Sequence, residues 1–207
     1  MFTVVGFIIF IYSIIIHEIA HGLMAERLGD PTARLSKRLT LNPLPHIDPM
    51  MSILFPLLLI FSGSPIIFGA AKPVPIDPYN LRNPKKDMGL IGLAGPLSNL
   101  FLAVLLSLIA RLFQYSIFLE VIKYSVRINI ILAIFNLLPL PPLDGGRVAV
   151  ALLPEKYGRA LASLERFGIF IVIFLLLFPN PLFSLPRLVG SITNLLFSLL
   201  FPQSPLI

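Results

Sequence analysis

The sequence of 207 residues contains no cysteine and few charged residues. The absence of cysteine excludes disulfide bonds, thiolate metal sites and a cysteine nucleophile, so any metal ion must be held by His, Asp or Glu. Only 13% of the residues are charged and 57% are hydrophobic, which is typical of integral membrane proteins rather than soluble globular ones.

The basic residues do not indicate a nucleic-acid binder. The net charge is +6, but the 16 Lys and Arg residues are scattered between apolar blocks and form no polar basic face. Orientation in a membrane explains their excess better, so we expect a lipid bilayer and no nucleic acid among the partners.

The N-terminal apolar run predicts a retained membrane helix. It has no positively charged start and no small-residue cleavage site, which argues against a signal peptide. The helix is expected over residues 2–28, with Gly29, Asp30 and Pro31 as stop signals. At about 1.5 Å per residue, it is long enough to cross a bilayer.

The rest of the chain alternates apolar segments with polar or proline-broken ones. The further apolar segments are 50–71, 88–110, 115–138, 160–178 and 187–201, and a turn over 179–186 separates the last two. The stretches between them predict loops with short extended pieces. We therefore expect an all-α polytopic membrane protein with a three-helix core, a re-entrant or short membrane segment, extended loop pieces and two C-terminal helices.

Residues 50–71 can either cross the membrane or dip into it and return, because 62–65 interrupt the apolar run. In the re-entrant case 12 Lys and Arg residues lie on one side and 4 on the other, namely Arg111, Lys123, Arg127 and Arg187. In the crossing case the split is 8 to 8 and carries no orientation signal. The positive-inside rule therefore favours the re-entrant model, with the basic side toward the cytoplasm.

The sequence HEIAH, residues 17–21, ends the first apolar run. His17 and His21 are four residues apart, so on a helix their imidazoles project from one face and can bind one metal ion. Glu18 lies beside that face. In this HExxH spacing the two His coordinate zinc and the Glu is the general base. The pattern also arises by chance, but ionisable groups in a membrane helix cost roughly 2.5–3.5 kcal/mol each, which favours a functional site.

A tetrahedral zinc ion held by two His and a water lacks one protein ligand. The candidates near an apolar segment are His46, Asp48 and Asp144. Asp144 follows a proline-rich run and precedes two glycines, which let the backbone approach another element closely. An Asp before Gly is also a common turn former. However, the re-entrant topology places Asp144 at the depth of HEIAH, so we expect it to be the third ligand.

Three motifs in this order resemble the site-2 protease family of intramembrane zinc metalloproteases. They are HEIAH at 17–21, AGPLSN at 94–99 and FNLLPLPPLDGG at 135–146. The resemblance covers roughly the first three quarters of the chain. It implies one Zn²⁺ per chain.

The resemblance implies His17, His21 and Asp144 as zinc ligands and Glu18 as the catalytic base. It also points to Asn136 as a group that positions substrate or stabilises the oxyanion. Without the resemblance, Asn136 is equally well explained as a helix-end cap.

LNPLPHIDP, residues 41–49, is similar to the compact branch of this family, which lacks PDZ and CBS domains. That branch implies a role for His46 and Asp48 in ordering the loop, shaping substrate access or supporting the metal site. We expect Asn99 and the Gly95-Pro96 pair to serve helix packing, because small residues let membrane helices approach closely.

The resulting expectation is an intramembrane protease that cleaves transmembrane protein substrates. Residues 1–150 would form the catalytic membrane core and 151–207 a C-terminal helical hairpin, and regulation would reside in the loops, that hairpin or other proteins. Extended stretches at 72–79 and 137–143 would present strand-like edges to an unwound substrate.

Two other functions use the same residues. A metal-ion or proton transporter would be expected to show paired broken helices in two related halves, and no internal repeat is present. A pseudoprotease that binds membrane helices without cutting them would be expected to have lost Glu18 or a ligand, and all of them are present.

Overall fold

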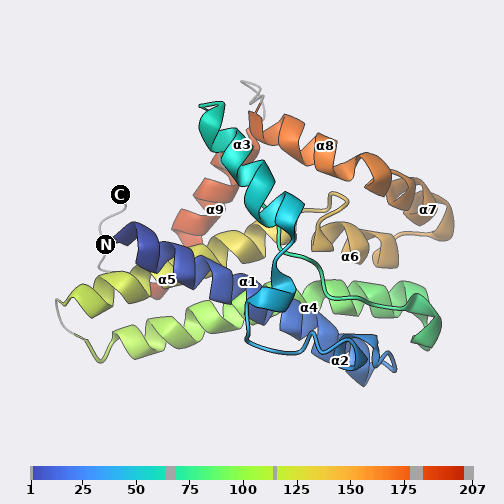
Figure 1. The fold of residues 1–207 in the computed structure, drawn as a ribbon, viewed down its shortest axis with the longest axis horizontal. Coiled ribbons are helices and arrows are strands. Elements are labelled where there is room, and N and C mark those ends of the chain that lie inside the picture. The colour runs from blue at the N-terminus through green and yellow to red at the C-terminus, as the bar shows by residue number, and fades with distance from the viewer. Residues whose placement is uncertain (1, 64–68, 114–115, 178–183, 203–207) are drawn as a thin grey trace.

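The computed structural model describes residues 2–63, 69–113, 116–177 and 184–202. Within these ranges the chain is built from helices and contains no β-strand (Figure 1). The expectation of an all-α membrane protein is confirmed.

Helix α1 (Phe2–Arg27) matches the predicted N-terminal helix. It ends because Gly29 adopts a φ of 115°, which favours glycine, and because the Asp30 N–H bonds back to the Ala25 carbonyl. Pro31 then prevents the helix from continuing. The catalytic motif at 17–21 therefore lies within the second half of a continuous membrane-length helix.

Helices α1, α4 (Pro84–Ala110) and α5 (Ile117–Asn136) pack side by side as the expected three-helix core (Figure 1). By length and composition, α1 and α4 can cross a membrane. Helix α4 begins four residues before the predicted start because Pro84 occupies its first turn. In addition, the Asp87 carboxylate accepts a hydrogen bond from the Asn83 N–H at 2.8 Å.

The predicted re-entrant segment forms a hairpin-like excursion. A π-helical stretch, η2 (Pro49–Leu54), continues into α3 (Phe55–Phe61). Together they span about 20 Å, less than the roughly 30 Å of a bilayer core. The Ala70 N–H bonds to the Met51 carbonyl at 3.1 Å, so the two ends of the segment lie side by side. Residues 64–68, including part of the predicted break, lie outside the described residues.

The loop expected over 32–49 contains more regular structure than predicted. It holds a short helix, α2 (Thr32–Leu35), and a 3₁₀ turn, η1 (Leu44–His46). Another 3₁₀ turn, η3 (Pro78–Asn80), follows the proline-rich stretch before α4.

The C-terminal region differs from the expected pair of long helices. Helix α6 (Asp144–Leu152) is followed by α7 (Glu155–Ser163), α8 (Glu165–Leu177) and α9 (Leu185–Leu200). The single helix predicted over 160–178 is wrong, because the chain breaks at Leu164: residues 160–163 end the exposed α7, and α8 begins at Glu165. Residues 178–183, most of the predicted turn, lie outside the described residues.

Helix α9 shares a hydrophobic core with α5. Val126 and Ile130 of α5 pack with Val189 and Phe197 of α9. The Arg127 guanidinium also lies 4.6 Å from the centre of the Phe197 ring. The boundary expected after residue 150 falls within α6 and stays a prediction.

Asp30 ties the end of α1 to the chain that precedes α4. Its carboxylate is buried and accepts hydrogen bonds from the Thr32 N–H, the Thr32 hydroxyl, the Asp77 N–H and the Asn80 amide. Burial alone would raise the pKa of Asp30, but these donors stabilise the charged form and bring the pKa below its ordinary value.

A stability test follows from this shift. A carboxylate whose pKa is lowered by folding stabilises the folded state at pH values above the pKa of the unfolded chain, about 3.9. This stabilisation is lost as the pH falls through the lower pKa of the folded state. At pH 7 Asp30→Asn should therefore be less stable than wild type by about 1–3 kcal/mol. Thermal unfolding in detergent should show the difference shrinking below about pH 4. A difference that stays constant down to pH 3 would contradict this role.

Candidate metal centre

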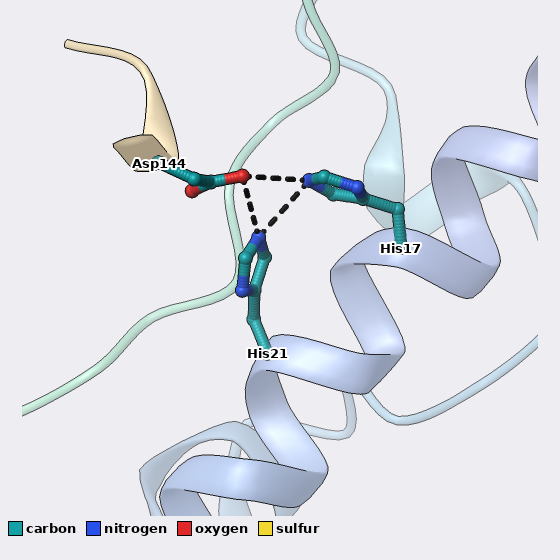
Figure 2. A group of neighbouring side chains, drawn as sticks. All are labelled: His17, His21 and Asp144. Carbon is teal, nitrogen blue, oxygen red and sulfur yellow. Dashed lines mark hydrogen bonds and ion pairs between the residues drawn. The ribbon is translucent and has the colours of Figure 1, made fainter. Parts of the chain in front are cut away.

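Three side chains converge on one point. His17 and His21 lie one turn apart on α1, and their Nε2 atoms are 3.0 Å apart. Asp144, the first residue of α6, places its Oδ2 at 3.0 Å from His17 Nε2 and 3.2 Å from His21 Nε2 (Figure 2). All three residues are buried, with exposed fractions of 6%, 4% and 7%.

Asp144 reaches the two His because the chain after α5 folds back tightly. The stretch 137–143, expected to be extended, forms successive turns instead, with hydrogen bonds from the Leu140 N–H to the Leu138 carbonyl and from the Leu143 N–H to the Leu140 carbonyl. A Cβ at Gly145 would overlap the Leu137 carbonyl, so only glycine fits this approach. The expectation that the two glycines permit close contact is confirmed.

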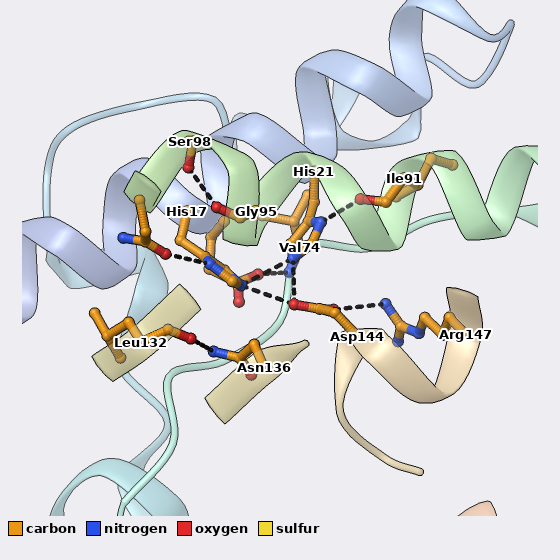
Figure 3. A network of polar contacts seen from close by, with 12 residues as sticks. His17, His21, Val74, Ile91, Gly95, Ser98, Leu132, Asn136, Asp144 and Arg147 are labelled. Atoms are coloured by element: carbon orange, nitrogen blue, oxygen red, sulfur yellow. Dashed lines mark hydrogen bonds and ion pairs between the residues drawn. The ribbon is translucent and has the colours of Figure 1, made fainter. Parts of the chain in front are cut away.

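The hydrogen bonds of the imidazoles fix which nitrogen faces the centre. His17 Nδ1 lies 2.7 Å from the Asn99 Oδ1. His21 Nδ1 lies 2.6 Å from the Ile91 carbonyl oxygen (Figure 3). Both partners are acceptors, so each Nδ1 carries the proton in the neutral ring. Each Nε2 therefore presents a lone pair to the centre.

This donor set fits a zinc ion. Two imidazole lone pairs and a carboxylate oxygen lie within 3.2 Å of one another, and buried Asp144 Oδ2 has no hydrogen-bond donor among the described residues. Three such electron pairs repel unless a cation lies between them. Tetrahedral zinc with bonds of about 2.0 Å separates its ligands by about 3.3 Å, close to the observed spacing.

Helix α4 passes so close to the two His that any side chain at position 95 would displace their rings. A Cβ on Gly95 would lie 2.5 Å from His21 Nε2 and 2.6 Å from His17 Nε2. The expectation that Gly95 serves helix packing was incomplete, because its lack of a side chain also makes room for the metal ligands.

A buried polar network supports His17 from behind. Asn99 accepts from His17 and donates to the Asn129 Oδ1 at 2.8 Å and to the Ser13 carbonyl at 3.2 Å. Asn129 in turn donates to the Ser13 hydroxyl at 3.0 Å. Asn99 was expected to serve helix packing, and neither Asn129 nor Ser13 was predicted to support the site. Two asparagines in apolar helices were the available signal, since polar groups in membrane helices are costly and usually functional.

Glu18 lies on α1 beside the three ligands. Its Oε2 accepts a hydrogen bond of 2.8 Å from the backbone N–H of Val74, which belongs to the extended chain before α4. The structure thus places the predicted catalytic base next to the metal ligands but outside their triangle.

The other predicted site residues make no hydrogen bond or ion pair with the three ligands among the described residues. Asn136, in the last turn of α5, donates to the Leu132 carbonyl of its own helix at 3.0 Å. His46 is buried in η1, where its Nε2 lies 2.9 Å from the Thr40 carbonyl oxygen. Asp48 accepts from the N–H groups that begin η2. These contacts favour a loop-ordering role for His46 and Asp48, whereas substrate binding by any of the three stays a prediction.

Comparison with known proteins agrees with this site. Residues 112–179 match the model of peptidase family M50. The chain is 35% identical to "Putative zinc metalloprotease YwhC" of Bacillus subtilis, over 84% of this chain and 80% of that protein. It is 36% identical to Rip2 of Mycolicibacterium smegmatis, which has the same description, over 81% of this chain and 64% of that protein.

A third relative is "Zinc metalloprotease MJ0392" of Methanocaldococcus jannaschii, 28% identical over 76% of this chain and 37% of that protein. No solved structure matches the chain. The chain thus spans most of the length of the Bacillus relative and less than two thirds of the other two. With the three converging ligands and the HExxH helix, these similarities show that the chain belongs to peptidase family M50, the site-2 protease family.

Proposed function

We propose that this protein is a multi-pass zinc metalloendopeptidase that hydrolyses peptide bonds in or near transmembrane segments of other membrane proteins. The observation that carries the proposal is the convergence of Asp144 with His17 and His21 beside Glu18. Both His and Glu18 lie on α1, a helix long enough to cross a membrane. The curated relatives named as zinc metalloproteases support the same chemistry.

The residues of the site have two roles, metal binding and proton transfer. His17, His21 and Asp144 would hold the zinc ion, which when bound acts as a Lewis acid that polarises a carbonyl and makes water more acidic. Glu18 takes the proton from the attacking water and delivers it to the nitrogen of the leaving amine. The Asn99 and Ile91 oxygens keep both imidazoles in the tautomer that binds metal.

Hydrolysis also requires water and an unfolded peptide. His17 lies ten residues before the end of α1 at Arg27, after which the chain is polar and basic. The asymmetry of the Lys and Arg residues supports an active site that is reached from the cytoplasmic side. A substrate helix must unwind there, because a helical peptide bond engages its carbonyl in a backbone hydrogen bond.

Neither the structure nor the relatives favour ion transport or a non-cleaving pseudoprotease. Within the described residues, the possible metal ligands form a single cluster, and Glu18 stands beside it. A protease site is the function that uses all of these groups.

Metal removal tests the proposal. The purified protein, reconstituted in vesicles with a single-span peptide substrate, should cleave the peptide inside or next to its apolar segment. Cleavage should stop after dialysis against a chelator and return with about one equivalent of Zn²⁺ but not with Mg²⁺. Mass spectrometry of the fragments identifies the cut. Cleavage that persists in the zinc-free protein would refute the proposal.

A further inference from the structure

Residues 72–77, here called the strap, cross the active site as an extended chain and are held at several points. The Lys72 N–H donates to the His46 carbonyl at 2.9 Å. The Val74 N–H donates to Glu18 Oε2 at 2.8 Å, and the Asp77 N–H donates to Asp30 Oδ2 at 2.7 Å. The strap thus bonds to the end of α1 on one side and to η1 on the other.

The prolines of the strap explain which amides are available. Pro73 and Pro75 have no N–H and fix φ near −65°, so the backbone between them is held extended before folding. Val74 is the residue between these prolines, and its N–H points at Glu18. A strap with the amides of Lys72, Val74 and Asp77 already engaged offers few donors to a substrate strand. The use of 72–79 as an edge for substrate stays a prediction.

Arg38 holds the carbonyl side of the strap. Its side chain is buried, and Nη2 donates to the Lys72 carbonyl at 2.6 Å and the Pro73 carbonyl at 3.3 Å. Among the described residues, no carboxylate pairs with this guanidinium. Burying a charge without a carboxylate partner costs several kcal/mol, which the hydrogen bonds to the two carbonyls must offset. The carbonyls it holds belong to the two residues directly before Val74.

We propose that Arg38 is a positioning residue, which fixes the strap so that the Val74 N–H orients the Glu18 carboxylate toward the metal ligands. Among the described residues, no donor reaches Glu18 Oε1, so this oxygen is free to accept the proton from water while Oε2 is held. A backbone amide suits this task because it keeps its proton at every working pH. The inference rests on the proposed function, since it assigns the orientation of the general base.

Val74→Pro tests the hydrogen bond directly, because proline removes the N–H and suits the extended backbone. We expect kcat to fall by about 10- to 100-fold, the usual effect of losing a hydrogen bond to a charged group, with KM and bound zinc unchanged. Ala71→Pro is the matched control: its N–H has no partner among the described residues, so kcat should stay at the wild-type value. An unchanged kcat in Val74→Pro, in a wild type that cleaves, would overturn the inference.

Arg38→Ala tests the residue that acts through the strap. The same loss of kcat is expected, and millimolar guanidinium should restore part of it by binding in the vacated space. Arg34→Ala, which removes an exposed arginine paired with Glu26, should behave as wild type. Loss of activity with no rescue by guanidinium, together with loss of bound zinc, would indicate a merely structural arginine and overturn the assignment.

Amide exchange tests the contact without any activity. In zinc-free wild type the Val74 amide should exchange slowly. Glu18→Ala should accelerate exchange at Val74 while Lys72 and Asp77 stay protected, and Arg38→Ala should accelerate Lys72 and Val74 together. Exchange at Val74 that is equal in wild type and Glu18→Ala would show that the contact is absent. A wild type that cleaves nothing would instead refute the proposed function and leave this exchange test decisive for the contact.

Discussion

Gly95→Ala is expected to abolish zinc binding and peptide cleavage while leaving the helical fold intact. The added Cβ would lie 2.5–2.6 Å from His21 Nε2 and His17 Nε2, closer than any real contact. The atoms it meets are the ends of side chains, so the two rings can turn away without moving α1 or α4. Those rings are the metal ligands, and their displacement should lower zinc affinity at least about 100-fold.

The measurement is the zinc content of the purified variant, with cleavage and thermal unfolding of the zinc-free protein alongside. The matched control is Gly190→Ala in α9, where a Cβ would meet nothing within 4 Å. The control should keep zinc and activity, and both variants should unfold near the wild-type temperature when zinc-free. Full zinc content in Gly95→Ala would contradict the metal-centre geometry.

Much of the metal site was predictable from the sequence because its signals are local or topological. The spacing of His17 and His21 fixes their common face on any helix. Asp144 is distant in sequence, but counting Lys and Arg on the two sides of the membrane selected a topology that brings it to the same depth. The tight approach at Gly145 then follows from the residue type alone.

The contacts that orient the site were not predictable in the same way. Asn99 meets His17 across 82 residues, and Val74 meets Glu18 across 56. Such pairs depend on how helices and loops pack against each other in three dimensions. The spacing of apolar residues in a single sequence does not reveal that packing. The turns at 137–143 were missed for a related reason, because prolines exclude a helix without deciding between an extended chain and a series of turns.

The division of the chain after Ser163 shows how a hydrophobic average can mislead. The apolar run that begins at Phe167 suggested one helix from 160, but residues 160–163 are mostly exposed and form the end of α7, and α8 begins separately at Glu165. What remains, α8, has 13 residues. A helix needs about 20 residues to cross a bilayer core of about 30 Å. Helix α8 is shorter, so its packing against other helices, and not its length, decides how it lies in the membrane.

Glu18→Gln should retain zinc and lose cleavage by about 100- to 10,000-fold, because it removes the proton acceptor and leaves the ligands in place. A Gln side chain keeps an oxygen that can accept the Val74 N–H, so the strap should stay where it is and amide exchange at Val74 should remain slow. Zinc content, cleavage of a single-span peptide and ion flux in the same vesicles are the measurements.

This combination separates the protease from the two other functions that use the same residues. A transporter would carry ions in wild type without cutting the peptide, and flux that survives in Glu18→Gln would refute the protease. A pseudoprotease would show zinc and peptide binding in both proteins and fragments in neither. Retained zinc with lost cleavage is expected only if Glu18 moves the proton, since neither of the other two functions requires a base beside the metal ligands.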